Sequence, residues 1–166
     1  MTSVLKGDNI QNSSGTSALT IDSSGNVDMG ANSVVQIITN TYDTELNLST
    51  SFQDTGLYAT ITPKYSNSKI LVQWCTQYNG VDSSSSASLY EHIFRDSTQL
   101  DPTSDGMRIM TGYHNTRTYF TTSWVDEPAT TSAVTYKIQA KEASGDAGKA
   151  HENGNPSIMI LTEIRQ

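Results

Sequence analysis

The chain has 166 residues, of which 35% are hydrophobic and 16% charged, and its formal net charge is −7. This length fits one domain with a core of its own. The 10 Lys and Arg residues are scattered, which argues against nucleic-acid binding, because phosphates are neutralised by clustered cations. No apolar run approaches the roughly 20 residues that span a bilayer, and the N-terminal M-T-S-V-L-K-G-D-N lacks the apolar core of a signal peptide. We therefore expect synthesis in the cytoplasm and neither a membrane nor nucleic acid as partner.

Hydroxyl side chains are unusually frequent, with 22 Ser and 22 Thr residues. Thr suits a pleated, half-exposed strand surface, whereas Ser favours turns. No segment shows a convincing period of 3.6 residues, and alternation with period 2 recurs along the chain. The composition therefore predicts an all-β protein.

The first 33 residues are polar and contain few large side chains. Residues 18–22 and 26–29 flank Ser23-Ser24-Gly25, and Gly25 can adopt a positive φ without steric cost. This pattern predicts a tight hairpin. An isolated hairpin is marginal in water, so we expect residues 1–33 to form an attachment or trimer-entwining arm that packs on the body, on other copies or on a larger partner. Residues 34–166 would form the head.

The head begins with an apolar run at residues 34–39, predicted as its first strand, and residues 41–48 are predicted as the second. Residues 56–62 and 70–78 each alternate, and between them Pro63 ends one strand and residues 64–68 are polar. This stretch predicts a β-hairpin.

Further strands are predicted by alternation at residues 89–95, 98–100, 107–113, 118–125, 133–141 and 157–164. Residues 79–88 and 142–156 are predicted as an exposed connection and a mobile loop. The 89–95 and 157–164 strands carry apolar groups on both faces, so we expect both faces to be covered, inside a sheet or at a subunit seam. About eight to ten strands at this spacing are typical of a jelly-roll β-sandwich.

The side chains that could carry chemistry do not form a catalytic pattern. Cys75, the single cysteine, lies in a strand and is interpreted as a buried structural thiol. His92, His114 and His151 lack a second ligand at zinc-site spacing, so we interpret them as structural or solvated.

Two acidic stretches were considered as sites. Asp101, Asp105 and Gly106 partly match a calcium loop, but D-P-T-S-D-G is incomplete and reads better as a solvated turn. Asp126 and Glu127 could serve a glycosidase, although such pairs are common in turns. We assign no catalytic, cofactor-binding or metal-binding residue.

Several strand aromatics could form a carbohydrate or protein contact surface, or belong to the core or an oligomer interface. They are Tyr90, Phe94, Tyr113, Tyr119, Phe120, Trp124 and Tyr136.

Five blocks of the sequence form a recognisable series: S-G-T-S-A-L-T-I-D-S-S-G-N-V at residues 14–27, T-S-F-Q-D-T-G-L-Y-A-T-I-T-P-K-Y-S-N-S-K-I-L-V at 50–72, R-D-S-T at 95–98, D-E-P-A-T-T-S-A-V-T-Y-K-I-Q at 126–139 and S-I-M-I-L-T-E-I at 157–164. In this order they resemble small virion structural proteins of marine and cyanobacterial tailed bacteriophages. The first resembles the N-terminal attachment hairpin of phage fibre-type proteins. The resemblance implies a trimeric jelly roll similar to tumour-necrosis-factor and complement heads, with no catalytic residues and no cofactor.

These observations favour a non-enzymatic virion protein, a homotrimeric capsid decoration (cement) protein whose arm binds the major capsid protein or other virion proteins. Two alternatives remain open. One is a tail-fibre or receptor-binding tip whose loops at residues 79–88 and 142–156 contact a host glycan or protein. The other is a hydrolase of surface polysaccharide that uses Asp126.

Overall fold

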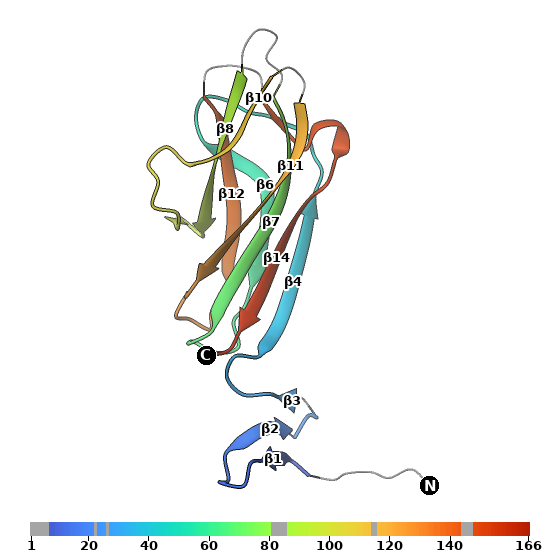
Figure 1. The fold of residues 1–166 in the computed structure, drawn as a ribbon, viewed down its shortest axis with the longest axis vertical. Helices are drawn as coiled ribbons and strands as arrows, with labels where there is room; N and C mark the ends of the chain where they lie inside the picture. The colour runs from blue at the N-terminus through green and yellow to red at the C-terminus, as the bar shows by residue number, and fades with distance from the viewer. Residues whose placement is uncertain (1–6, 22, 26, 81–85, 114–115, 144–147) are drawn as a thin grey trace, which may run out of the picture.

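The computed structural model describes residues 7–21, 23–25, 27–80, 86–113, 116–143 and 148–166, and these residues form two packed antiparallel sheets with a small third sheet at one end (Figure 1). The first large sheet has the order β4-β14-β7-β13-β5, and β11 pairs with the other edge of β7. Its strands are β4 (Val34–Tyr42), β5 (Leu46–Asn47), β7 (Lys69–Gly80), β11 (Thr116–Asp126), β13 (Lys149–Ala150) and β14 (Ser157–Ile164).

The second large sheet has the order β10-β8-β12-β6, and β9 pairs with β8. Its strands are β6 (Gln53–Ile61), β8 (Ser86–Arg95), β9 (Thr98–Gln99), β10 (Met107–Tyr113) and β12 (Val134–Glu142). Among the described residues, no helix is long and apolar enough to cross a membrane.

The eight long strands pair in a nested order, which identifies the topology. The pairs are β4 with β14, β6 with β12, β7 with β11, and β8 with β10. A chain folded back on itself in this way and wrapped into two four-stranded layers is a jelly roll. The predicted all-β jelly-roll sandwich is thus confirmed.

The hairpin predicted across Pro63 is wrong, although both of its strands exist. β6 pairs with β12, whereas β7 pairs with β14, β13 and β11, so the two strands lie in opposite sheets. Ile61 and Ile70, at the two ends of the connection, are 1% and 0% exposed because both point into the shared core. Alternation shows that each strand buries one face, but it does not select the strand's partner.

Two other predictions are corrected. No separate strand covers residues 41–48, because β4 continues through Tyr42 and β5 has only two residues. The segment predicted as a mobile loop at residues 142–156 contains β13 and a short 3-10 helix, Glu152–Gly154 (η1), and it buries His151 completely. Residues 144–147 within this loop, and residues 81–85 of the connection predicted at 79–88, lie outside the described residues, while the rest of that connection belongs to β7 and β8, with Asn79 buried and not exposed as predicted.

The core between the two large sheets contains a carboxyl group. Glu91 on β8 is fully buried and accepts hydrogen bonds from Trp74 Nε1 at 2.9 Å and from the Tyr78 hydroxyl at 2.5 Å, both on the opposite sheet. Burial raises the pKa of Glu91, and the two hydrogen bonds oppose that effect. The strand at 89–95 was expected to be covered on both faces, and on its outer face His92 is only 4% exposed.

The small sheet consists of β1 (Asn9–Gln11), β2 (Ser17–Ile21) and β3 (Val27–Asp28), in that order. β2 and β3 form the predicted hairpin, with Gly25 at φ 82°, whereas β1 was not predicted. The small sheet lies beyond one end of the sandwich, the end at which the C-terminus is also found (Figure 1).

Few contacts join the small sheet to the sandwich. Asp28 is ion-paired with Arg165, its carboxylate accepts from the Tyr65 hydroxyl at 3.2 Å, and the guanidinium lies 4.4 Å from the Tyr65 ring centroid. These polar contacts fix the sheet without burying its apolar residues, of which Ile10, Val27 and Met29 are 49%, 56% and 63% exposed.

Candidate functional site

The acidic residues considered for catalysis or calcium are engaged in structural contacts. Asp101, 3% exposed, accepts from the Ile93 amide at 3.0 Å and from Thr103 Oγ1 at 2.6 Å, and it lies 2.9 Å from His92 Nδ1. Burial alone would raise the pKa of Asp101, but these hydrogen bonds hold it below its usual value. Its oxygens fasten the loop after β9 to β8, and Asp105 remains exposed.

The structure separates the candidate glycosidase pair. Asp126 accepts hydrogen bonds from Arg95 and from the Tyr136 hydroxyl, both at 2.7 Å. The Glu127 side chain is 69% exposed and pairs with Lys69 at 3.3 Å. The Asp126 carboxylate thus connects the end of β11 to the second sheet, whereas the Glu127 carboxylate forms an ion pair at the surface.

His151 links the two large sheets through hydrogen bonds whose directions can be assigned. Its Nε2 lies 3.0 Å from the Thr55 carbonyl, which only accepts, so Nε2 carries the proton. Because burial favours the neutral imidazole, Nδ1 is then an acceptor, and the Ser157 hydroxyl, which itself accepts from the Gln77 amide at 3.0 Å, donates to it at 2.7 Å. The imidazole is neutral, and burial lowers its pKa below 6.5. This Ser–His pair resembles a catalytic dyad in distance only, since both side chains are at most 1% exposed.

Stability should fall with acid in the range where His151 would be protonated. Below pH about 6.5 the unfolded chain takes up a proton on this residue while the folded chain does not, so the free energy of unfolding drops, by at most about 1.4 kcal/mol per pH unit. Urea unfolding of wild type and His151→Gln between pH 7.5 and 5 should show this slope in the wild type and a smaller slope in the variant. Glu91 has a raised pKa, so its protonation increases the free energy of unfolding as the pH falls. This contribution is the same in the wild type and the variant and does not affect their comparison. Parallel pH profiles would contradict the assignment.

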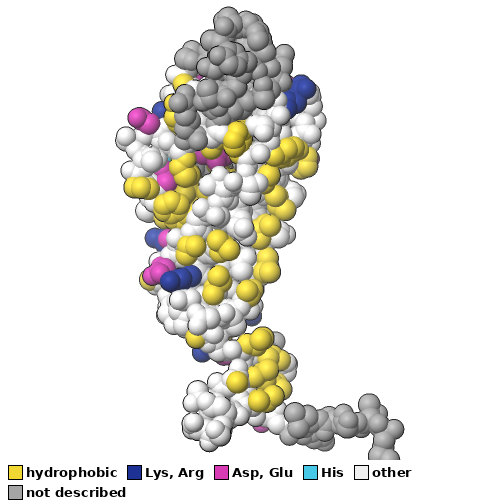
Figure 2. Space-filling model, viewed as in Figure 1, with side chains coloured by type: hydrophobic (Ala, Val, Ile, Leu, Met, Phe, Trp, Pro, Cys, Tyr) yellow, Lys and Arg dark blue, Asp and Glu magenta, His cyan; other side chains and the backbone are white. Residues whose placement is uncertain are grey.

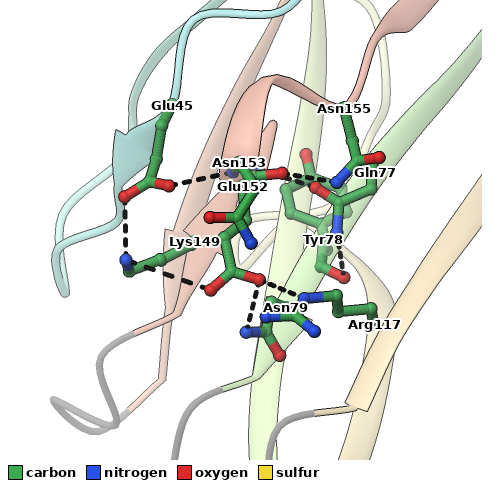
Figure 3. A network of polar contacts seen from close by, with 9 residues as sticks. All are labelled: Glu45, Gln77, Tyr78, Asn79, Arg117, Lys149, Glu152, Asn153 and Asn155. Carbon is green, nitrogen blue, oxygen red and sulfur yellow. Dashed lines mark hydrogen bonds and ion pairs between the residues drawn. The ribbon is translucent and has the colours of Figure 1, made fainter.

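A polar network lies at the end of the sandwich opposite the small sheet (Figures 1 and 3). Glu152 pairs with Arg117 and accepts from Asn79 Nδ2 at 2.8 Å, and Arg117 lowers the pKa of Glu152. Lys149 bonds Glu45 at 2.8 Å. The network connects η1, β13 and Glu45, the residue before β5, to β7 and β11. Its two carboxylates and two cations neutralise each other. It accounts for the order of the segment expected to be mobile.

The outer face of the sheet formed by β4, β14, β7 and β11 is uncharged over three successive rows. Its outward side chains are half-buried or exposed, while their neighbours along each strand point into the core. In the order β4, β14, β7, β11 the rows are Thr41, Ile158, Cys75 and Thr121; Thr39, Ile160, Gln73 and Ser123; Ile37, Thr162, Leu71 and Val125. We call these twelve residues the uncharged face. Figure 2 shows this side in yellow and white, with blue and magenta groups toward its margin.

The uncharged face contrasts with the outer face of the other sheet. There Lys137 pairs with Asp54 at 3.0 Å, and Lys141 lies 4.6 Å from the Phe52 ring centroid. An antiparallel sheet with one solvated face normally alternates apolar-in and polar-out. β14 departs from this rule, because Ile158, Ile160 and Ile164 point outward. This strand lies inside a sheet as predicted, since β4 and β7 flank it, but its outer face is only half-buried within the chain.

Several predicted side-chain positions can be compared with the structure. Cys75 is not buried as expected but half-buried on the uncharged face. Among the aromatics, Tyr136 is in the core, Phe120 and Trp124 pack against it, Tyr119 is 52% exposed, and Tyr90 and Phe94 are half-buried on the other outer face. The side chains of Tyr113 and His114 lie outside the described residues.

A groove of about 490 Å³ separates the small sheet from the sandwich. Its walls are β2 and β3 on one side and the start of β4 on the other, with Lys64 and Tyr65 at the end. Val34, on its β4 wall, is 58% exposed. Sequence reasoning identified the arm but not this groove, because Lys64 and Val34 are brought together only by the jelly-roll wrapping.

Comparisons with known proteins give distant structural similarity alone. No family model and no curated protein matches the chain. The crystal structure of the infectious bursal disease virus VP2 subviral particle is similar at 13% identity and a TM-score of 0.43, covering 80% of this chain and 34% of that chain. The structure of the Gx strain of the same virus is similar at 14% identity and a TM-score of 0.36, covering 95% and 43%. This chain thus spans less than half the length of those chains. The assignment of the jelly-roll fold rests on the strand order of this chain and not on these similarities.

Proposed function

We propose that this protein is a non-enzymatic virion structural protein, a homotrimeric capsid decoration protein that binds the shell through its N-terminal small sheet. The observation that carries the proposal is the small sheet itself. It stands at one end of a jelly roll, is fixed by a few polar contacts, and leaves Ile10, Val27 and Met29 about half exposed or more. An exposed apolar patch on a small sheet marks an interaction site.

The uncharged face supports the trimeric part of the proposal. Each copy carries a net charge of −7, so copies repel one another, and a contact surface without charges avoids adding like charges at close range to that repulsion. The uncharged face meets this condition, and its centre has the outward isoleucines Ile158 and Ile160 and the half-buried Leu71. Burying such side chains between copies stabilises an oligomer by about 25 cal/mol per Å² of apolar surface.

The protein would act by stabilising the assembled shell mechanically and not by catalysing a reaction. A decoration protein that binds only the assembled shell stabilises it by mass action, and three arms on one trimer would raise the effective concentration of each arm at the shell. The resemblance of residues 14–27 to phage attachment hairpins is consistent with this role. Asp126 and the His151–Ser157 pair are engaged within the fold, so neither supports the polysaccharide hydrolase alternative.

Removing the arm tests the proposal. Deletion of residues 1–30 removes the small sheet but none of the described sandwich strands, so the truncated protein should fold and keep three copies per oligomer. It should lose binding to purified particles of the source virus produced without this protein. Sedimentation of fluorescently labelled protein with such particles measures the binding. Undiminished binding of a folded truncated protein would contradict attachment through the arm.

A further inference from the structure

We propose that the groove between the small sheet and the sandwich takes an extended, apolar protein segment that carries a carboxylate, bound as an added strand. This inference rests on the proposed function, because it identifies what the arm holds on the particle. The partner chemistry follows from three features of the groove: its strand edges, its exposed apolar side chains and its lysine.

Two strand edges border the groove. β3 is the last strand of the small sheet and pairs only with β2 among the described strands, and β4 is the outer strand of its sheet and pairs only with β14. Val27 and Asp28 of β3 and Val34 and Val35 of β4 face the groove from opposite sides. An edge strand presents backbone donors and acceptors, and an extended peptide is the ligand that satisfies them.

The groove exposes apolar side chains among polar ones such as Thr20 and Ser33. Val27, Met29 and Val34 line it and are 56%, 63% and 58% exposed. Figure 2 shows the small sheet as a concentration of yellow side chains below the sandwich. In an added strand every second side chain points to the same side, so a segment with alternating apolar residues would cover these three side chains.

The lysine of the groove favours an acidic segment. Among the described residues that line the groove, the one carboxylate is that of Asp28, which is paired with Arg165 and accepts from the Tyr65 hydroxyl. Lys64 is exposed and has no carboxylate partner among the described residues, unlike the six cations in ion pairs. Lys64 thus supplies an exposed ammonium group at the groove that can pair with a carboxylate on the partner.

Matched variants test the groove on particles of the source virus that lack this protein. Lys64→Gln should weaken particle binding about tenfold at low salt and less at high salt, because it removes one charge pair. Lys141→Gln removes the other described lysine without a carboxylate partner, on the outer face of β12, and should bind within twofold of wild type. Val34→Ser should also weaken binding, whereas Tyr58→Ser, at a side chain 51% exposed on β6, should not.

Amide hydrogen exchange distinguishes an added strand from other contacts. Binding to particles should slow exchange at residues 27–29 and 34–36. If wild type binds particles but Lys64→Gln and Val34→Ser bind equally well, or these amides stay unprotected, the groove is not the binding site and attachment uses another surface. If wild type does not bind particles at all, the proposed attachment function fails, and this inference fails with it.

Discussion

Replacing Glu163 with Ala is expected to lower the free energy of unfolding by about 3–5 kcal/mol. This carboxylate on β14 is fully buried and accepts four hydrogen bonds. The donors are the Lys64 and Tyr65 amides at 2.9 and 3.2 Å, the Ser68 hydroxyl at 2.7 Å and the Gln36 amide group at 2.6 Å. It therefore holds the connection from β6 to β7 against both β4 and β14, and its loss leaves several donors without a partner.

Two further variants isolate the role of Glu163. Glu163→Gln keeps one acceptor oxygen and should cost about half as much as Ala. Glu127→Ala removes a carboxylate that is 69% exposed and ion-paired with Lys69, and should cost less than about 1 kcal/mol. Urea unfolding at one protein concentration measures all three, because oligomers unfold in a concentration-dependent way. Similar losses for Glu163→Ala and Glu127→Ala would contradict the importance of this buried carboxylate.

Replacing Ile160 with Lys is expected to dissociate the proposed trimer. Ile160 lies in the middle row of the uncharged face, between Thr39 and Gln73 in register. A lysine at this position would bring three like charges into an apolar contact, where the cost of desolvation has no compensating pair. Sedimentation velocity should give three times 18.1 kDa for wild type and 18.1 kDa for the variant.

Tyr58→Lys is the matched control for Ile160→Lys. Tyr58 is exposed on the outer face of the opposite sheet, and a lysine there should leave the trimer intact. The variants must be compared in unfolding as well, since Ile160 is half-buried. A wild-type mass of one chain, or dissociation by Tyr58→Lys and not by Ile160→Lys, would show that the uncharged face is not the contact between copies.

Alternation predicted most of the strands because it reports burial of one face directly. Residues 133–141 illustrate this, since Val134, Tyr136, Ile138 and Ala140 are all buried as the pattern indicates. Strand pairing was not predictable in the same way. The polar connection across Pro63 is typical of a hairpin, yet it crosses between sheets, because pairing is decided by contacts with β12 and β14, far away in sequence.

The polar groups inside the fold were missed for a related reason. Glu91 and Glu163 occupy inward positions of their strands. The sequence pattern shows that these carboxylates point inward, but it does not show which hydrogen-bond donors will surround them. Those donors come from other strands: Trp74 and Tyr78 for Glu91, and Gln36 for Glu163. The outward isoleucines of β14, in contrast, were visible in the sequence as a strand with two apolar faces.

The number of copies per particle tests the central proposal most directly. Quantitative mass spectrometry of purified particles, calibrated against the major capsid protein, gives this number. A decoration protein bound at capsid seams predicts hundreds of copies, in a multiple of three per repeating position on the shell. A handful of copies would contradict decoration and indicate a tail or fibre component, and absence from the particle would contradict a virion role.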